Sequence, residues 1–400
     1  MRRRVAVTGL GAICAVGGDV PAMWSALLAG QSGIGPIAGI ATNRLSASIA
    51  AEIAGFDGAA HFDSRRLPLL DRSAQLALVA AREAMRQADL APDLVQAARR
   101  GAIMAAAIGQ SSLDAGYLAL YGEGASRVHP FTVPRVMPNA PASHLSIEFG
   151  LRGPCYAVAS ACASGNHAIA LAADTIRAGR AEVILAGGAD ASIVVGVLKS
   201  WEALRVLSTD TCRPFSRDRS GLVLGEGAAV LVLEDWDHAQ RRGGAILAEV
   251  AGSGMSADAA DITAPDIGGA SAAMQGALDD AGLDAAEIGY VNAHGTGTRL
   301  NDRIESAALR RVFGRPPPVS SSKSMIGHCL SAGGALEAVA TIMALRDGVL
   351  PPTAGFRETD PECEVDCVPN VARAVPIQAA LSNSFAFGGL NAVLAFRKAA

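Results

Sequence analysis

The chain has 400 residues, enough for one large or two medium domains with a substantial core. Its formal net charge of −4 creates no overall basic field, which argues against nucleic acid as a partner. The cysteines are odd in number, seven, and scattered, a pattern typical of reduced thiols in a cytoplasmic protein. There is no run of about 18 apolar residues, so no membrane span is expected.

The N-terminal segment MRRRVAVTGLGAICAVGG imitates a secretory signal, with a basic tip before an apolar stretch. Several glycines interrupt that stretch, and the β-branched VAVT predicts a first strand followed by a tight turn. GLGAIC also imitates a dinucleotide-binding loop, but Cys14 stands where the third glycine belongs. We therefore predict neither a leader nor a dinucleotide site here.

Further along, apolar runs alternate with Ala/Leu-rich helical stretches, as in RSAQLALVAAREAMRQADL followed by GAIMAAAIG. This alternation predicts an α/β protein whose strands are buried on both faces. The segment SACASGNHAIALAADTIRAG predicts a small-residue turn, then a helix, then a basic end with glycine. The later segment SSSKSMIGHCLSAGGALEAVATIMALRDG has the same order of features. We predict two similar βα halves, residues 1–240 and 241–400.

The segment SACASG holds Cys162 between an apolar stretch and a predicted helix. Unpaired amides at a helix N-terminus favour the thiolate and lower the pKa of a cysteine placed there. Small neighbours also allow a tight turn and the approach of an acyl group. Cys162 is thus a candidate nucleophile, and the alternative is a buried, inert cysteine.

Two segments in the second half of the chain contain candidate histidines. His294, in NAHGTGT, lies at the end of a strand beside Thr296 and Thr298, whose hydroxyls suit an amide-rich ligand. Lys323 and His328, in SSKSMIGHCLSAGG, surround a turn into a Gly/Ala helix, whose N-terminus disfavours a charged imidazole. A lone histidine is more often structural, so the weight of these residues comes from their occurring together.

The C-terminal segment SNSFAFGGLNAVL places Phe385 and Phe387 in a Gly-rich loop, either as core or as an apolar gate over a pocket. Cys363 and Cys367, in CEVDC, have no second Cys/His pair nearby, so a metal site is not expected there.

Together, these segments supply the groups needed for acyl transfer to a thiol and carbon–carbon bond formation: a nucleophile, two imidazoles, a lysine, hydroxyls and an apolar gate.

The motifs ACASG, AHGTGT, KSMIGH and SFAFGGLN, in this order, resemble those of β-ketoacyl-acyl-carrier-protein synthases of the elongating, decarboxylating type. The resemblance covers essentially the whole chain. It implies the thiolase-like fold, with two similar halves in a five-layered α-β-α-β-α core. It also implies an acyl carrier protein as partner, no cofactor, a cytoplasmic location and usually a homodimer, with a heterodimer of related subunits as the alternative.

The same resemblance implies the roles of the site residues. Cys162 would carry the acyl chain as a thioester, and His294 and His328 would bind the malonyl thioester carbonyl and assist loss of carbon dioxide. The backbone amides of Cys162 and Phe387 would form an oxyanion hole. Phe385 and Phe387 would then be gate residues.

Supporting residues follow from the resemblance in the same way. Thr296 and Thr298 would bind pantetheine, and Lys323 would order a polar network with Glu305 as its carboxylate partner and Asp302 nearby. Some relatives hold a monovalent cation, and the matching positions here are Asn292, Glu337 and Asn383.

Three features depart from the pattern of housekeeping fatty-acid enzymes. Ala386 replaces a glycine in the gate, and Asn301 resembles nodulation-type and polyketide-type relatives. Ser112 stands near the place of a bulky residue that limits the acyl pocket, which predicts a longer or stiffer acyl chain.

The rival interpretation is a non-catalytic partner subunit that sets chain length, but such partners typically lack the cysteine. A degradative thiolase would need a second catalytic cysteine in place of FAFGGLN, and an initiating synthase would need asparagine in place of His328.

Overall fold

The protein is described here by a computed structural model, which covers residues 3–91, 94–106 and 109–399. Within them, ten strands form one sheet in the order β10-β9-β13-β14-β8-β1-β7-β6-β4-β5. The strands from the first part of the chain are β1 (Val5–Cys14), β4 (Arg100–Ala106), β5 (Cys155–Val158), β6 (Val183–Asp190) and β7 (Gly227–Asp235). Those from the second part are β8 (Ala248–Ala257), β9 (Ile288–Asn292), β10 (Val319–Ser320), β13 (Ala379–Ala386) and β14 (Leu390–Lys398).

The sheet is a duplication. When the strands of each part are numbered in chain order, both parts have the order 3-2-4-5-1, and parallel and antiparallel pairs fall at the same places. The two parts join where β1 and β8 pair antiparallel, Ala6 with Glu249 and Val7 with Ala248. The prediction of two similar βα halves is confirmed, while a boundary at residue 240 stays a prediction.

Helices form the other layers of the fold. They are α1 (Val20–Leu28), α2 (Arg72–Ala88), α3 (Gln110–Tyr117), α4 (Thr132–Val136), α5 (Ala140–Phe149), α6 (Ser164–Arg177), α7 (Val195–Ala203), α8 (Trp236–Arg241), α9 (Ile267–Ala281), α10 (Arg299–Phe313), α11 (Lys323–Ile326) and α12 (Leu330–Asp347). Short turns of helix are η1 (Gly58–Ala60), η2 (Leu67–Leu69), η3 (Ala97–Arg99), η4 (Leu118–Gly122), η5 (Ala161–Ala163) and η6 (Ala285–Glu287). Two small ribbons complete the chain, β2 (Gly35–Pro36) with β3 (Ile49–Ala50) and β11 (Val349–Leu350) with β12 (Arg373–Ala374).

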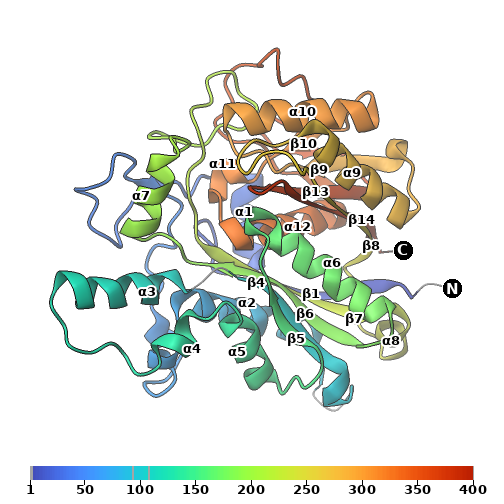
Figure 1. The fold of residues 1–400 in the computed structure, drawn as a ribbon. Helices are drawn as coiled ribbons and strands as arrows, with labels where there is room; N and C mark the ends of the chain where they lie inside the picture. The colour runs from blue at the N-terminus through green and yellow to red at the C-terminus, as the bar shows by residue number, and fades with distance from the viewer. Residues whose placement is uncertain (1–2, 92–93, 107–108, 400) are drawn as a thin grey trace.

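The layers are stacked so that α6 and α12 lie in the middle (Figure 1). These two helices contact each other, α6 and α12 both contact β4, β6 and β7, and α12 also packs on β13 and β14. The outer faces are covered by α2 and α5 on one side and by α9 and α10 on the other, which gives the predicted α-β-α-β-α order. Since α12 is surrounded by protein, it is buried from Ser331 to Leu345 and has no polar stripe.

The tight turn predicted after VAVT comes later in the chain than expected. β1 continues through Gly9 and Gly11 as a buried strand to Cys14, and the turn follows there, where the Gly17 N–H donates to the Cys14 carbonyl at 3.1 Å. A Cβ atom on Gly9 or Gly11 would collide with the backbone of α2, at Ala84 and Ala80 respectively. These glycines therefore permit a close approach of helix and strand.

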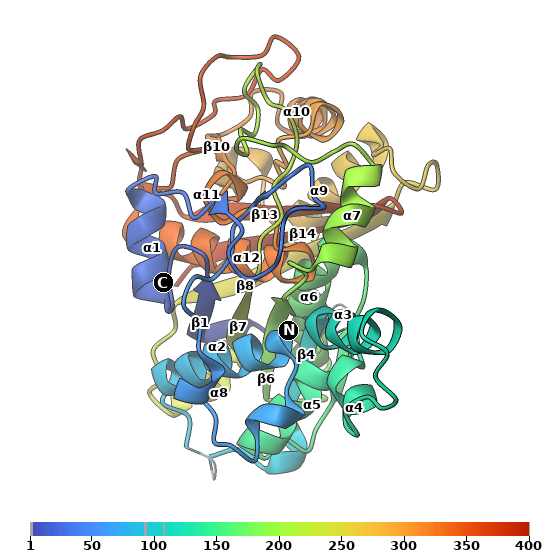
Figure 2. The ribbon, with the colours of Figure 1, turned by 90° about the vertical axis from the view of Figure 1, so that its left-hand side faces the viewer.

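A second view shows α3, α4 and α5 gathered at one side of the molecule (Figure 2). Of these helices, α5 contacts β5, whose only neighbour in the sheet, within the described residues, is β4. Of the helices in the described part of the chain, none combines the length and the hydropathy that crossing a membrane requires.

Candidate active site

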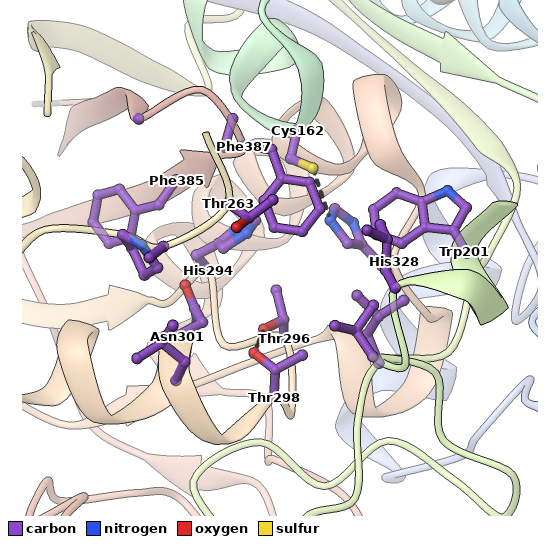
Figure 3. Close-up of a pocket in the computed structure, with 18 residues that line it drawn as sticks. Cys162, Trp201, Thr263, His294, Thr296, Thr298, Asn301, His328, Phe385 and Phe387 are labelled. Carbon is purple, nitrogen blue, oxygen red and sulfur yellow. Dashed lines mark hydrogen bonds between the residues drawn. The ribbon is translucent and has the colours of Figure 1, made fainter. Parts of the chain in front are cut away.

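A cavity of about 250 Å³ lies where the two central helices begin (Figure 3). Its lining contains most of the residues that the sequence selected, contributed by segments far apart in the chain: Cys162, His294, Thr296, Thr298, His328, Phe385 and Phe387. Asn301, which the sequence analysis noted, also lines it, as do residues that the sequence analysis did not select, among them Trp201, Leu204, Thr263 and Leu300.

Cys162 is presented by a strained turn. It lies in η5, directly before α6, and the preceding Ala161 has a φ of 47°, in the left-handed region that favours glycine. The small residues after it let α6 meet α12 closely, because a Cβ atom on Gly165 would lie 2.7 Å from the backbone nitrogen of Ala335. The small neighbours of Cys162 thus bring the starts of two helices together.

His328 comes from the corresponding place in the second half, just before α12. Its Nε2 is 3.1 Å from Cys162 Sγ, and the backbone N–H of Leu330 donates to its Nδ1 at 3.3 Å. A backbone N–H can only donate, so Nδ1 is unprotonated and a neutral ring carries its proton on Nε2. The ring therefore directs an N–H donor at the sulfur.

His294 follows β9 and has a matching arrangement. Lys323 Nζ lies 3.3 Å from His294 Nδ1, so an ammonium donating there leaves the ring proton on Nε2. The His294 and His328 rings lie nearly perpendicular, with centroids 5.4 Å apart. On its other side, His294 is contacted by the buried ring of Phe385, with centroids 6.1 Å apart.

Burial controls protonation in this cavity. It lowers the pKa of His294 and of His328 well below 6.5, and the positive charge of Lys323 acts in the same direction. Both imidazoles are therefore neutral near pH 7, as predicted for His328. The predicted low pKa of Cys162 is wrong, because burial raises the pKa of its thiol to about 12, although Lys323 opposes the change. The resting residue is therefore a thiol, with the His328 N–H directed at its sulfur.

The carboxylate partner of Lys323 is Glu337 on α12, and the prediction of Glu305 is wrong. Glu305 instead accepts the backbone N–H groups of His294 and Gly295, each at 2.8 Å, so it holds the histidine loop. Asp302 has a related role, accepting the backbone N–H groups of Phe215 at 2.8 Å and Gly297 at 3.2 Å.

Side-chain oxygens that could serve as ligands for a monovalent cation lie beside the Lys323–Glu337 pair. Buried oxygens without a hydrogen-bond partner occur on all three residues that the resemblance selected: Asn292 Oδ1, Glu337 Oε2 and Asn383 Oδ1. Unsatisfied carbonyl and carboxylate oxygens are the donors that hard cations take. The residues present therefore fit such an ion.

Thr296 and Thr298 project into the cavity with their hydroxyl oxygens 2.9 Å apart. Asn301 lines the wall nearby, and its Nδ2 donates to Asp302 Oδ1 at 3.2 Å. Ser112 is not part of this cavity. It lies on α3 and lines a separate hollow of about 390 Å³, so the expectation that its small side chain permits a longer or stiffer acyl chain stays a prediction.

Trp201 is the main residue that the sequence did not reveal. It lies on α7 in the segment VGVLKSWEA, which contains no motif, and its ring stacks on Phe387 with centroids 5.7 Å apart and planes 22° apart. Only the fold brings these positions, 186 residues apart by number (387 − 201), to one wall of the cavity.

In this duplicated five-layered fold, a thiol and a neutral imidazole at the starts of two central helices face one cavity with a second neutral imidazole from the loop after β9. This arrangement defines a thiolase-like acyltransferase. Sequence profiles of known families agree. The profile of the beta-ketoacyl synthase N-terminal domain matches residues 2–239, and that of the C-terminal domain matches residues 247–357. The chain belongs to the β-ketoacyl synthase family.

Named relatives are similar over their full length. Nodulation protein E from Rhizobium sp. (strain N33) is 51% identical over 402 residues, with 100% of both chains covered. The 3-oxoacyl-[acyl-carrier-protein] synthase 2 of Staphylococcus aureus (strain COL) is 40% identical, with 99% of this chain and 98% of that protein covered. The solved structure of the ishigamide ketosynthase/chain length factor matches with a TM-score of 0.94 and 37% identity, over 100% of both chains.

Proposed function

We propose that the protein is a 3-oxoacyl-[acyl-carrier-protein] synthase that elongates an acyl chain by decarboxylative condensation with a malonyl thioester. The observation that carries this proposal is the contact of Cys162 Sγ with His328 Nε2 at 3.1 Å, with the His294 ring facing the same cavity. This set offers one nucleophile and two N–H donors.

In the first step, the sulfur of Cys162 attacks the acyl carbonyl carbon, the bond from that carbon to the carrier sulfur breaks, and the proton of the Cys162 thiol passes to the carrier, which leaves as a thiol. Because burial opposes a free thiolate, the His328 N–H donor and the charge of Lys323 support the sulfur while it reacts. The backbone amides of Cys162 and Phe387 would hold the oxyanion.

In the second step, the carbonyl oxygen of the malonyl thioester accepts hydrogen bonds from Nε2 of His294 and of His328. Loss of carbon dioxide leaves the electron pair on an enolate, whose oxygen these donors stabilise more strongly than the starting carbonyl. The enolate carbon attacks the acyl carbonyl carbon on Cys162, the bond from that carbon to the sulfur breaks, and the sulfur takes up one proton from solvent to restore the thiol. Lys323 keeps the His294 proton on Nε2 throughout, since it occupies Nδ1.

Two groups of residues support these steps. Thr296 and Thr298 would bind the pantetheine arm, for which their paired hydroxyls suit an amide. Asn292, Glu337 and Asn383 would hold a monovalent cation, which would supply fixed positive charge behind the Lys323–Glu337 pair.

The acyl carrier protein is the proposed partner, in the cytoplasm, and the chain is proposed to pair with a second chain of the same fold. Within the described residues β5 has one unpaired edge, and exposed apolar side chains occur on η4, α4 and α5; both features support such pairing. The exposed fractions are 83% for Tyr121, 73% for Val133 and 74% for Ile147. A homodimer is proposed, and native mass spectrometry with and without co-expressed relatives distinguishes it from a heterodimer.

The test is intact-protein mass spectrometry after incubation with a panel of acyl carriers. The wild-type chain should gain one acyl group, and Cys162→Ala should gain none while keeping its fold. A Cys162→Ala variant that still condensed would refute the assignment of the nucleophile. In contrast, His294→Ala should reduce malonyl decarboxylation more than acylation of Cys162, and equal losses would contradict the division of roles.

A further inference from the structure

The ring of His328 is held from behind by the first turn of α12. Leu330 is the first residue of this helix, and its backbone N–H donates to His328 Nδ1 at 3.3 Å. The first amides of a helix have no partner inside the helix, so each needs an acceptor from elsewhere. For Leu330 that acceptor is the imidazole itself. The geometry of this turn therefore decides which nitrogen of the His328 ring keeps the proton.

The backbone of this turn is strained. Leu330 has a φ of 46°, in the left-handed region, which is unfavourable for a residue with a Cβ atom. The chain before it is fixed independently, because the His328 N–H donates to the Val223 carbonyl at 2.7 Å and the His328 carbonyl accepts the N–H of Gly225 at 3.0 Å. A strained residue persists only where the structure around it holds it. The turn therefore also has to be held from the helix side.

The group that holds it there is the carboxylate of Asp190, the last residue of β6. Asp190 Oδ2 accepts the backbone N–H of Ser331 at 3.3 Å and the Ser331 hydroxyl at 2.8 Å, and Oδ1 accepts the hydroxyl of Ser192. The side chain is buried, at 1% exposure, and a carboxylate at a helix N-terminus is also favoured by the helix dipole. Asp190 thus takes the second amide of α12, directly after the amide that His328 takes.

Strand β6 and α12 meet closely at this point because of a glycine. A Cβ atom on Gly188 would lie 2.7 Å from the carbonyl oxygen of Ser331 and 3.1 Å from Ala332 Cα. Asp190 is not among the described residues that line the cavity with Cys162. Any effect of this carboxylate on the reaction is therefore transmitted through the start of α12.

We propose that Asp190 is a positioning residue: by capping α12 through Ser331, it holds the strained turn at Leu330 and so keeps the His328 proton on Nε2, directed at the sulfur of Cys162. Without the cap, Leu330 would relax and its N–H would leave Nδ1, so that the ring proton is shared between both nitrogens. The benefit to condensation rests on the proposed function, whereas the tautomer of His328 is a property of the folded chain.

The test is nitrogen NMR of the full chain labelled with nitrogen-15 in histidine, without substrate. It is made near pH 8, because burial raises the pKa of Asp190 to about 6 and the carboxylate has to be ionised. The signals of His328 are assigned by their loss in His328→Asn. In the wild-type chain they should show an unprotonated Nδ1 and a protonated Nε2.

In Asp190→Ala the two signals should move toward each other. The ratio of the Nε2-protonated to the Nδ1-protonated ring should fall by about 2- to 30-fold, the range that corresponds to the loss of one helix cap. Asp190→Asn should keep the wild-type signals, since its amide oxygen still accepts the Ser331 N–H. Unchanged signals in Asp190→Ala would overturn the proposal.

A rescue variant separates positioning from simple destabilisation. Leu330→Gly in the Asp190→Ala background should restore the wild-type signals, because glycine adopts a φ of 46° without strain and keeps the N–H that Nδ1 accepts. A structural role alone predicts no rescue, since the cap is still missing. Signals that stay shifted in the double variant would therefore contradict the proposal.

Asp19→Ala is the matched control. Asp19 caps α1 by accepting the Ala22 N–H at 2.8 Å, so its replacement removes a cap from a helix that carries no histidine. The His328 signals should stay in place, and a shift equal to that of Asp190→Ala would show a non-specific effect and refute the proposal. Should Asp190→Ala fail to fold, Ser331→Ala removes only the 2.8 Å hydrogen bond and should move the signals in the same direction by a smaller amount. No movement there would also refute it.

This measurement does not depend on catalysis. A tautomer that follows Asp190 and Leu330 as described, in a chain that fails to condense, would support the positioning role and refute the proposed function. The reverse result, condensation by a chain whose His328 signals ignore Asp190, would refute the positioning role alone.

Discussion

The buried pair of Lys323 and Glu337 offers the most direct test of how the site is held. Both side chains are 1% exposed, and Lys323 also contacts His294. In Glu337→Gln the ammonium stays in place without a compensating charge. Breaking a buried ion pair from one side costs about 3–5 kcal/mol, because the remaining charge is desolvated and unpaired. We expect a loss of this size in the free energy of unfolding.

Urea unfolding followed by circular dichroism measures the change as a shift of the midpoint at constant slope. Glu358→Gln is the control, since its ion pair with Arg217 has side chains 60% and 62% exposed and should contribute under about 1 kcal/mol. A Glu337→Gln loss no larger than that of the control would refute the reasoning. Replacing both partners, in Lys323→Met with Glu337→Leu, should recover stability but deprive His294 Nδ1 of its donor and slow decarboxylation.

Three further outcomes follow from the packing, the free oxygens and the histidines. Gly165→Ala should lower the free energy of unfolding by about 1–3 kcal/mol, because the added methyl group forces α6 away from Ala335. Gly276→Ala is the control, since this position on α9 has room for a methyl group and the change should be neutral or stabilising; similar shifts in melting temperature for both variants would contradict this. The melting temperature should be higher in potassium or sodium chloride than in choline chloride of equal ionic strength, and Asn292→Leu should remove the difference; an unchanged difference would exclude this ligand set. The free energy of unfolding should decline as pH falls below 6.5, because His294 binds a proton in the unfolded chain but stays neutral when it is buried in the folded one. His294→Asn should make this decline with pH shallower, and an unaltered slope would show that His294 does not contribute.

Much of the site could be predicted because its motifs carry their chemistry locally. Cys162 in SACASG, His294 in NAHGTGT and His328 before a Gly/Ala helix were all recognisable from neighbouring residues, and they share one cavity. The buried strands were also predictable, since runs such as AEVILAGGAD are apolar throughout, and β6 is buried along its whole length. Local composition is enough for such features.

Contacts between residues that only the tertiary fold brings together could not be predicted from the sequence. Glu305 and Glu337 are both acidic residues near Lys323 in sequence, and only the arrangement of α11, α10 and α12 decides that Glu337 forms the pair. Gly9 and Gly11 look like turn residues until α2 is seen against β1. Trp201 has no motif around it, and it acquires a role only because α7 faces the turn at Phe387.

The amino-acid sequence by itself determined the family, and it selected the candidate nucleophile and the two imidazoles, because these depend on short motifs in a given order. The tertiary structure decided the protonation of Cys162, the carboxylate of Lys323 and the neighbour of Phe387. Each of these depends on burial or on contacts between distant segments, and both arise only when α6 and α12 pack in the middle of the duplicated sheet.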